Sequence, residues 1–569
     1  MYIERFTKGR KTRVILLRES IRKGKIIEKR TLANLSPLDD VAVDMLDRYL
    51  KGEAFYSVDD TFTKISGKSH GHVQAVLSAM RKLKIPELIS STRSRERDLV
   101  VAMIAGRVLS AQSKLGSITS WENTSLPQLL GIEDATEDHL YNAMDWLFQR
   151  KERIESRLVA RHLKPGDLVL YDASSSYVEG KKCPLAERGY SRDKKKGKKQ
   201  INYGIATDSE GRPVMIETFA GNTSDSATLL PMVEKLRTRH RLTKFVLAAD
   251  RGMLANPNIK VLSSLGDIGW ITVLRSDVIK TLVNQTNLQL GLFDETNLLE
   301  FVAEDLYPGE RFIACRNPFL KKKLTEDRES MLVKTEELLE KIAKRVKAGK
   351  LKQSGKIGVA VGKVINKFKM GKHFTTTIEE GHFAFERNEN SIQEDGMLDG
   401  IYVIRTSLKA DELDARTCVQ SYKNLSKVEE VFKTLKSADL RIRPIYHYTE
   451  NRVRTHLFLC MLSYYVEWHM RQAWAELTFV DEDKDTREDP VSPVKRSDSA
   501  KKKDSTKRNE DELRLRKFSE VLSALATLQK ATYRARKGEV VREFEIPEEM
   551  TPLQRRALQL IDTITVSSK

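Results

Sequence analysis

Apolar residues recur along this chain with two different periods, which divide it into helical and sheet-forming parts. Between residues 77 and 163 the period is that of a helix, because Val100, Ile104 and Val108 fall on one face. Thr136 stands where the N-cap of a further helix is expected. We therefore predict a helical region, which could serve either as a scaffold or as a surface that grips a partner.

Residues 166–275 have a different pattern, in which short apolar runs alternate with turns and helical stretches. The predicted strands cover residues 168–171, 201–206, 214–219, 245–249 and 268–274, and a helix at 225–241 precedes the fourth strand. The order is strand, strand, strand, helix, strand, helix, strand. It predicts an α/β layered fold, and it is the strand order of the ribonuclease H-like fold.

Changes in composition set the remaining boundaries. Residues 276–396 interrupt the sheet pattern, which the apolar run at 400–405 resumes, and residues 481–512 have too few aliphatic side chains to bury a core. The expected parts are an N-terminal β unit with a polar segment (1–75), a helical region that could bind DNA (76–165), the first part of the α/β core (166–275), an inserted subdomain (276–396), the second part of the core (397–475), a disordered linker (476–512) and a small C-terminal region (513–569).

The balance of charge favours a polyanionic partner. Lys and Arg number 99 against 80 Asp and Glu, a net charge of +19, and nucleic acid is the commonest partner of such proteins. The four cysteines are scattered without a CxxC pair, which fits a reducing cytosol and no structural zinc. No signal peptide and no membrane-spanning run is apparent, and Leu457–Val466 has the length of a buried helix. We expect a cytoplasmic protein without membrane contact.

Three acidic residues carry the candidate chemistry. Asp172 follows the apolar run 168–171, Asp250 follows 245–249, and Glu429 lies in a Lys-rich helical pattern. Each alone is more often a cap, a turn residue or a solvated ion-pair partner. Together they could hold two divalent ions about 3.5–4 Å apart, as phosphodiester cleavage requires. Magnesium prefers such oxygen ligands, so we predict two Mg²⁺ ions, for which Mn²⁺ can substitute.

The helical pattern around Glu429 adds a possible phosphate contact. Tyr422, Glu429 and Lys436 are spaced by seven residues, close to two helical turns, and are therefore predicted to line one face of one helix. Lys433 flanks the same face. A cation two turns from a metal-binding glutamate is well placed to hold a DNA phosphate.

A second basic segment lies between the first two predicted strands. It contains nine basic residues from Lys181 to Lys199, among them Lys194, Lys195 and Lys196. The segment could be a solvated loop, but its charge and its place near Asp172 favour contact with DNA.

These residues resemble bacterial insertion-sequence transposases of the DDE type with the YREK signature. The matching residues are Tyr422, Glu429 and Lys436, together with strings around Asp172 and Asp250 and the string Gly189–Asp193. The arginine position of the signature holds Leu425, so its phosphate contact is missing or comes from Lys423 or Lys427.

The resemblance implies a transposase that cuts the ends of its element and joins the 3′-hydroxyl to target DNA. Its partners would be terminal inverted repeats and target DNA. It would act as a homodimer on paired DNA ends, in the cytoplasm at the bacterial nucleoid. In relatives, an insertion such as 276–396 helps to hold a hairpin intermediate. The alternatives are a ribonuclease H-like nuclease without strand transfer and an inactive DNA-binding relative. RNA binding is less favoured, because the aromatic motifs of common RNA modules are lacking.

Overall fold

The computed structural model describes most of the chain, which folds into two compact units. Its described residues are 1–8, 12–24, 26–53, 55, 62–286, 293, 296–483, 489–537, 540–546 and 549–565. The smaller unit comprises Met1–Lys68 and Gln529–Glu549, and the larger comprises Ser69–Leu528 and Met550–Lys569.

The smaller unit contains two antiparallel sheets of three strands each. One is formed by β1 (Tyr2–Lys8), β2 (Thr12–Lys23) and β3 (Ile26–Asn34), and the other by β4 (Phe62–Ser69), β15 (Gln529–Lys537) and β16 (Val540–Ile546). Helix α1 (Asp40–Leu50) covers part of the first sheet, where Ile15 and Val43 are buried. In the second sheet, β15 lies between β16 and β4.

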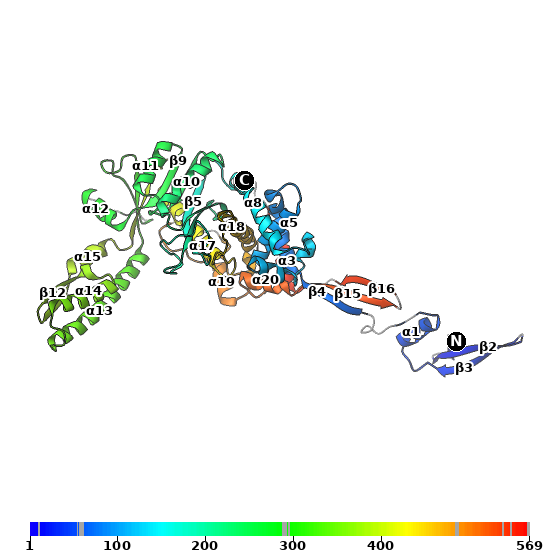
Figure 1. Cartoon of the computed structure of the whole chain (residues 1–569). Coiled ribbons are helices and arrows are strands. Elements are labelled where there is room, and N and C mark those ends of the chain that lie inside the picture. The colour runs from blue at the N-terminus through cyan, green and yellow to red at the C-terminus, as the bar shows by residue number, and fades with distance from the viewer. Residues whose placement is uncertain are drawn as a thin grey trace. The chain divides into compact units, whose positions relative to one another are not determined.

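The predicted helical region is present and forms one side of the larger unit (Figure 1). Its helices are α3 (Gly71–Lys82), α4 (Ile85–Ile89), α5 (Arg95–Leu109), α6 (Lys114–Trp121), α7 (Leu126–Leu130), α8 (Glu137–Phe148) and α9 (Lys151–His162). Thr136 caps α8, because its side chain accepts a hydrogen bond from the amide of His139. Helix α5 is buried on nearly every side rather than on one face, since α3, α8 and α18 (Glu450–Ala473) all pack on it.

The central sheet of the larger unit has eight strands in the order β10-β11-β14-β9-β8-β5-β6-β7. Its core strands are β5 (Leu168–Tyr177), β6 (Gln200–Thr207), β7 (Pro213–Ala220), β8 (Phe245–Ala249) and β9 (Ile268–Val273). Strands β5, β8 and β9 run parallel, whereas β6 and β7 are antiparallel to their neighbours. Helices α10 (Asp225–Thr238) and α11 (Asn256–Leu265) follow β7 and β8. The predicted ribonuclease H-like α/β core is therefore confirmed.

The sheet continues beyond the core into the segment expected to be an insertion. Strand β14 (Ile401–Thr406) pairs with β9, and β11 (Arg311–Arg316) and β10 (Leu298–Val302) follow it outward. Helix α12 (Ser276–Thr286) contacts β14. The residues 298–316 thus extend the central sheet, because the apolar side chains of β11 are buried against its neighbours.

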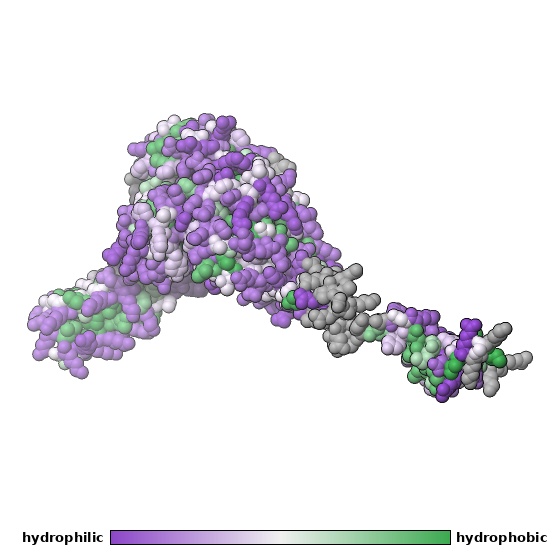
Figure 2. All heavy atoms as spheres, turned by 45° about the vertical axis from the view of Figure 1, so that its right-hand side comes forward, coloured by the Kyte–Doolittle hydropathy of each residue, from purple (hydrophilic) through white to green (hydrophobic). Residues whose placement is uncertain are grey.

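A separate lobe follows this extension. It consists of α13 (Pro318–Lys347), α14 (Ser354–Lys367), η1 (Gly371–His373), the hairpin β12 (Phe374–Glu379) and β13 (His382–Arg387), and α15 (Glu389–Met397). Leu332, Leu339 and Phe383 belong to a small core of its own. Figure 2 shows apolar side chains on the surface of this lobe, and the exposed ones there include Phe319 and Val359.

The last part of the core is helical. Helices α16 (Ala415–Lys423) and α17 (Leu425–Lys436) are separate, because the chain turns at Asn424, and the long helix α18 follows. The segment Leu457–Val466 lies buried within α18, as expected. Among the described residues, no helix is both long and apolar enough to cross a membrane.

The segment predicted to be a disordered linker contains ordered contacts. It includes η2 (Ala475–Leu477) and α19 (Asp498–Thr506), while residues 484–488 lie outside the described residues. Val491 and Ala500, two of its few aliphatic residues, are buried. These contacts attach the segment to the larger unit despite its polar composition. Helices α20 (Phe518–Ala526) and α21 (Pro552–Asp562) then pack against α3.

Candidate active site

Two of the predicted acids lie at one edge of the central sheet. Tyr171 of β5 and Ala249 of β8 form the last pair of the parallel ladder, and each is followed by an aspartate. Asp172 was expected to end its strand, but β5 continues to Tyr177 by pairing with β6. Asp172 therefore lies inside a strand, at the point where its neighbour β8 has ended.

The alternation of side chains along β5 decides which face Asp172 occupies. The hydroxyl of Tyr171 donates to the carbonyl of Thr228 in α10, 3.2 Å away, on one face of the sheet. Asp172 must point to the opposite face, together with its second neighbour Ser174. Ser174 pairs with Tyr203, whose ring lies 5.8 Å from that of Phe432 in α17. Asp172 is thus on the face that α17 covers.

Helix α17 brings the third acid to this face. Its buried residues are Val428, Val431, Phe432 and Leu435, which pack it on β5 and β6, while Glu429 is exposed. Both Asp250 and Glu429 lie near enough to Asp172 for their negative charges to act on its carboxyl group. The structure therefore brings the three acids into one neighbourhood.

Burial and charge both raise the pKa of Asp172, to about 7. Burial is the larger cause, the two other acids add to it, and the amide of Ala173 and the charge of Arg192 oppose it. Tyr422 shares this environment, because burial and the charges of Asp250, Glu429 and Asp172 raise its pKa to about 12. Crowded negative charge at a sheet edge is typical of sites that hold cations.

Backbone amides fix the orientation of the Asp172 and Asp250 carboxylates. The amide of Ala173 donates to Asp172 Oδ1 and the amide of Arg251 donates to Asp250 Oδ1, each at 2.7 Å. The three acids offer the carboxylate oxygens that Mg²⁺ prefers. Within the described ranges, however, no group of three or more His, Cys, Asp or Glu side chains is close enough together to hold one ion. The donor types fit a divalent ion, and the three acids would have to come closer together to hold one jointly.

Tyr422 does not lie on one helix with Glu429 and Lys436, although their spacing suggested a single helix. The turn at Asn424 puts Tyr422 on α16, and Glu429 and Lys436 on α17. A spacing of seven residues cannot reveal such a break, because the segments before and after Asn424 each have a helical pattern.

Lys436 contacts a buried acid. Its Nζ lies 3.1 Å from Asp193 Oδ1, and Arg443 forms an ion pair with the same oxygen. Asp193 also accepts the amide of Tyr177 through Oδ2 at 3.1 Å, and its side chain is 1% exposed. Lys436 thus joins α17 to the loop between β5 and β6.

The other predicted DNA-binding lysines differ in exposure. Lys194, Lys195, Lys196 and Lys433 are exposed. Lys423 instead donates to the carbonyl of Val491 at 3.1 Å. The two residues considered as substitutes for the signature arginine, Lys423 and Lys427, are thus both engaged, since Lys427 donates to the carbonyl of Ser209 at 2.7 Å.

Arg192 is a site residue that the sequence analysis did not single out. Its guanidinium forms an ion pair with Asp225, and its charge acts on Asp172. Its backbone amide donates to Ser175 Oγ at 3.2 Å, which fixes the loop against β5. The string Gly189–Asp193 was the signal that could have identified it.

The comparisons with known proteins concern the same part of the chain. The sequence profile of a family described as "Transposase DDE domain" matches residues 164–466, more than half of the chain, and this stretch contains Asp172, Asp250 and Glu429. No curated protein matches the chain. Among solved structures, the chain is similar to that entitled "Cryo-EM structure of piggyBac transposase synaptic complex with hairpin DNA", at 9% identity over 69% of this chain and 75% of that chain, with a TM-score of 0.34.

Proposed function

This chain belongs to the family of transposases with a DDE domain, and on that premise we propose that it cuts the ends of a DNA element and joins them to target DNA. The observation that carries the proposal is the approach of Asp172, Asp250 and Glu429 on the α17 face of the sheet. More specifically, we propose an insertion-sequence transposase of bacterial type that acts on terminal inverted repeats.

Asp172, Asp250 and Glu429 would hold two Mg²⁺ ions, or Mn²⁺ in their place. When bound, such ions stabilise the attacking and the leaving oxygen of a phosphodiester displacement. The two aspartates supply carboxylates whose Oδ1 atoms are fixed by the amides of Ala173 and Arg251. Water would attack first, to release the 3′-hydroxyl of the element, and that hydroxyl would then attack the target strand.

Positively charged side chains would position the DNA. Lys433 and the loop residues Lys194, Lys195 and Lys196 are exposed and can meet phosphates directly. Lys436, Lys423 and the hydroxyl of Tyr422 would join them on the same side of the site. Because Lys436 is paired with Asp193, its phosphate contact would require DNA to compete for that ion pair. We further propose a homodimer on paired ends, since two ends must be joined together, in the cytoplasm at the bacterial nucleoid.

The test is cleavage and strand transfer with terminal-repeat DNA and Mg²⁺. Asp172→Asn should abolish both steps while DNA binding survives, because binding rests on basic side chains. Asp267→Asn is the matched control: Asp267 is exposed and directly precedes β9, at the opposite ends of the parallel strands. Undiminished cutting by Asp172→Asn would remove this residue from the mechanism. Cutting without strand transfer by the unmodified chain would favour a nuclease, and DNA binding without cutting would favour an inactive relative.

A further inference from the structure

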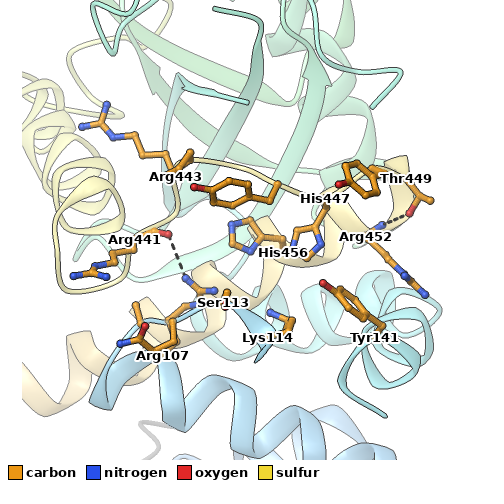
Figure 3. A pocket seen from close by; sticks show the side chains of 15 residues that line it. Arg107, Ser113, Lys114, Tyr141, Arg441, Arg443, His447, Thr449, Arg452 and His456 are labelled. Carbon is orange, nitrogen blue, oxygen red and sulfur yellow. Dashed lines mark hydrogen bonds between the residues drawn. The ribbon is translucent and has the colours of Figure 1, made fainter. Parts of the chain in front are cut away.

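A cavity of about 510 Å³ lies within the larger unit, and Asp172, Asp250 and Glu429 are not among the residues that line it (Figure 3). Helices α5, α6 and α8 contribute to one wall, and residues 441–449 with the beginning of α18 form the other. Its size is within the range of pockets that hold small ligands or parts of larger ones.

Cationic side chains line the cavity, and two of them are paired with carboxylates outside its lining, Arg443 with Asp193 and Arg452 with Asp145. Its described lining includes five cationic side chains and no carboxylate: Arg107, Lys114, Arg441, Arg443 and Arg452. Two histidines also line it, but both are neutral at pH 7, because burial lowers the pKa of His447 to about 3 and that of His456 well below its usual value. The cavity is therefore complementary to an anion.

Lys114 is the most unusual of these cations. It is 7% exposed, and its amine points into the cavity in Figure 3. Burial, and then the charge of Arg107, lowers the pKa of Lys114 to about 7. Within the described part of the chain, no ion pair joins its amine to a carboxylate, and the charged groups that act on it are Arg107 and Cys460. Lys151, by contrast, is equally buried but contacts Glu155 and Glu217. A buried ammonium without an anion is costly, so Lys114 indicates a ligand that supplies one.

Two helices begin at the cavity and add to its positive potential. Ser113 caps α6 by accepting the amide of Gly116 at 3.0 Å, and Thr449 caps α18 by accepting the amide of Arg452 at 3.4 Å. Both caps line the cavity. The partial positive charges of these helix N-termini favour a phosphate between them.

A neighbouring groove connects this cavity with helix α17. Arg441 and Arg443 line both, and Lys195, Lys436 and the carboxylate of Asp193, which is paired with Lys436 and Arg443, line the groove. In Figure 3 the guanidinium groups of Arg441 and Arg443 point away from Lys114. Both residues also line the groove. Since Lys436 ends the helix that carries Glu429, cations extend from that helix to the cavity.

We propose that the cavity holds a backbone phosphate of a DNA strand that passes along the end of α17, with Lys114 and the N-terminus of α6 as its partners. Tyr446 and Tyr448, which are 61% and 60% exposed at the cavity, would pack against the adjoining sugars. A DNA strand explains the groove and the exposed tyrosines, whereas a free phosphate would need neither. This inference rests on the proposed function, because it takes DNA as the substrate.

The test is the affinity for terminal-repeat DNA in EDTA, where cleavage plays no part. Lys114→Met should raise Kd about tenfold, or about 1.4 kcal/mol. It should also reduce the slope of log Kobs against log salt concentration by about 0.9, the share of one phosphate. The melting temperature of this variant should be unchanged or higher, because an unpartnered buried charge is removed. A structural role for Lys114 would instead lower the melting temperature.

Arg441→Gln should also weaken binding, and Arg241→Gln is its matched control. Arg241 and Arg441 are both exposed and both have positive φ, 59° and 41°, but Arg241 does not line the cavity. Unchanged Kd and salt slope in Lys114→Met would overturn the inference, whatever Asp172→Asn does to cleavage. Inorganic phosphate that stabilises the unmodified chain but not Lys114→Met, with equal DNA affinity of the two, would identify a free-anion site and would also overturn it.

Discussion

Lys436 Nζ lies 3.1 Å from Asp193 Oδ1, so the end of α17 is tied to the loop between β5 and β6. Asp193 holds the loop in turn, because it accepts the backbone amide of Tyr177 at the end of β5. The helix that carries Glu429 and the strand that carries Asp172 are therefore connected by an ion pair as well as by apolar packing.

A double-mutant cycle measures this connection. Lys436→Met and Asp193→Asn should couple by about 1–3 kcal/mol in the free energy of unfolding, since their side chains are only 13% and 1% exposed. Urea unfolding of the two single variants and the double variant gives the value. Effects that add to within about 0.5 kcal/mol would show that the pair contributes little.

Lys433 should contact a DNA phosphate directly. It is exposed on α17, one turn from Glu429, and it forms no ion pair with any residue that the structure describes. Lys433→Met should lower the salt slope of DNA binding by about 0.9 without lowering the melting temperature. Lys334→Met is the comparison, because Lys334 is exposed on α13 and should leave the slope unchanged.

Lys436 should show the same change in slope if DNA displaces Asp193. We expect Lys436→Met to flatten the slope by about one unit. Unlike Lys433→Met, it should also lower the stability of the free protein, because it leaves Asp193 with one cation fewer. A normal slope together with lowered stability would restrict Lys436 to the ion pair.

The buried ions near β7 predict a large stability effect. Lys151 lies 2.8 Å from Glu155 and 3.1 Å from Glu217, and all three side chains are less than 10% exposed. Lys151→Met leaves two buried carboxylates close together, and we expect a loss of about 3–5 kcal/mol in urea unfolding. Lys322→Met removes the exposed pair with Glu326 and should change stability by less than about 0.5 kcal/mol.

Buried histidines predict a loss of stability in mild acid. Burial lowers the pKa of His469 in the folded chain to about 3, below its usual 6.5. The unfolded chain therefore binds the extra proton between these values, so the contribution of His469 to stability is nearly constant above pH 7 and falls as the pH drops through 6.5 toward 3. At pH 5, His469 alone should cost about 2 kcal/mol.

His469→Phe tests this pH dependence, because phenylalanine keeps the ring packed against Tyr465 and Trp468. The variant should lose about 2 kcal/mol less than the unmodified chain between pH 7 and pH 5. His382→Phe, at an exposed position of β13, should not alter the dependence. Equal losses in all three proteins would assign the acid sensitivity to other groups.

Local patterns predicted the α/β core well because each strand and helix there has its own apolar signal. The order of β5 to β9 and the cap at Thr136 follow from residues close in sequence. The extension of the sheet by β10 and β11 could not be predicted, because the residues of a strand do not indicate which distant strand it pairs with. Val491 was missed for the same reason: a single aliphatic residue in a polar segment is buried only because another part of the chain covers it.

The site shows the same division. Strand positions alone predicted that Asp172 and Asp250 would meet, since parallel neighbours end at one edge. The spacing of Tyr422, Glu429 and Lys436 did not reveal the turn at Asn424. It also could not predict the ion pair between Lys436 and Asp193. Ion pairs between distant segments depend on the assembled fold.

The most direct test of the central claim is the number of Mn²⁺ ions bound in the presence of terminal-repeat DNA, counted by electron paramagnetic resonance. Two ions should bind per active site of the unmodified chain, and Asp172→Asn, Asp250→Asn and Glu429→Gln should each reduce that number or weaken the binding at least tenfold. Full occupancy with unchanged affinity in any one of these variants would show that its acid is not a ligand, and the same result in all three would contradict the account.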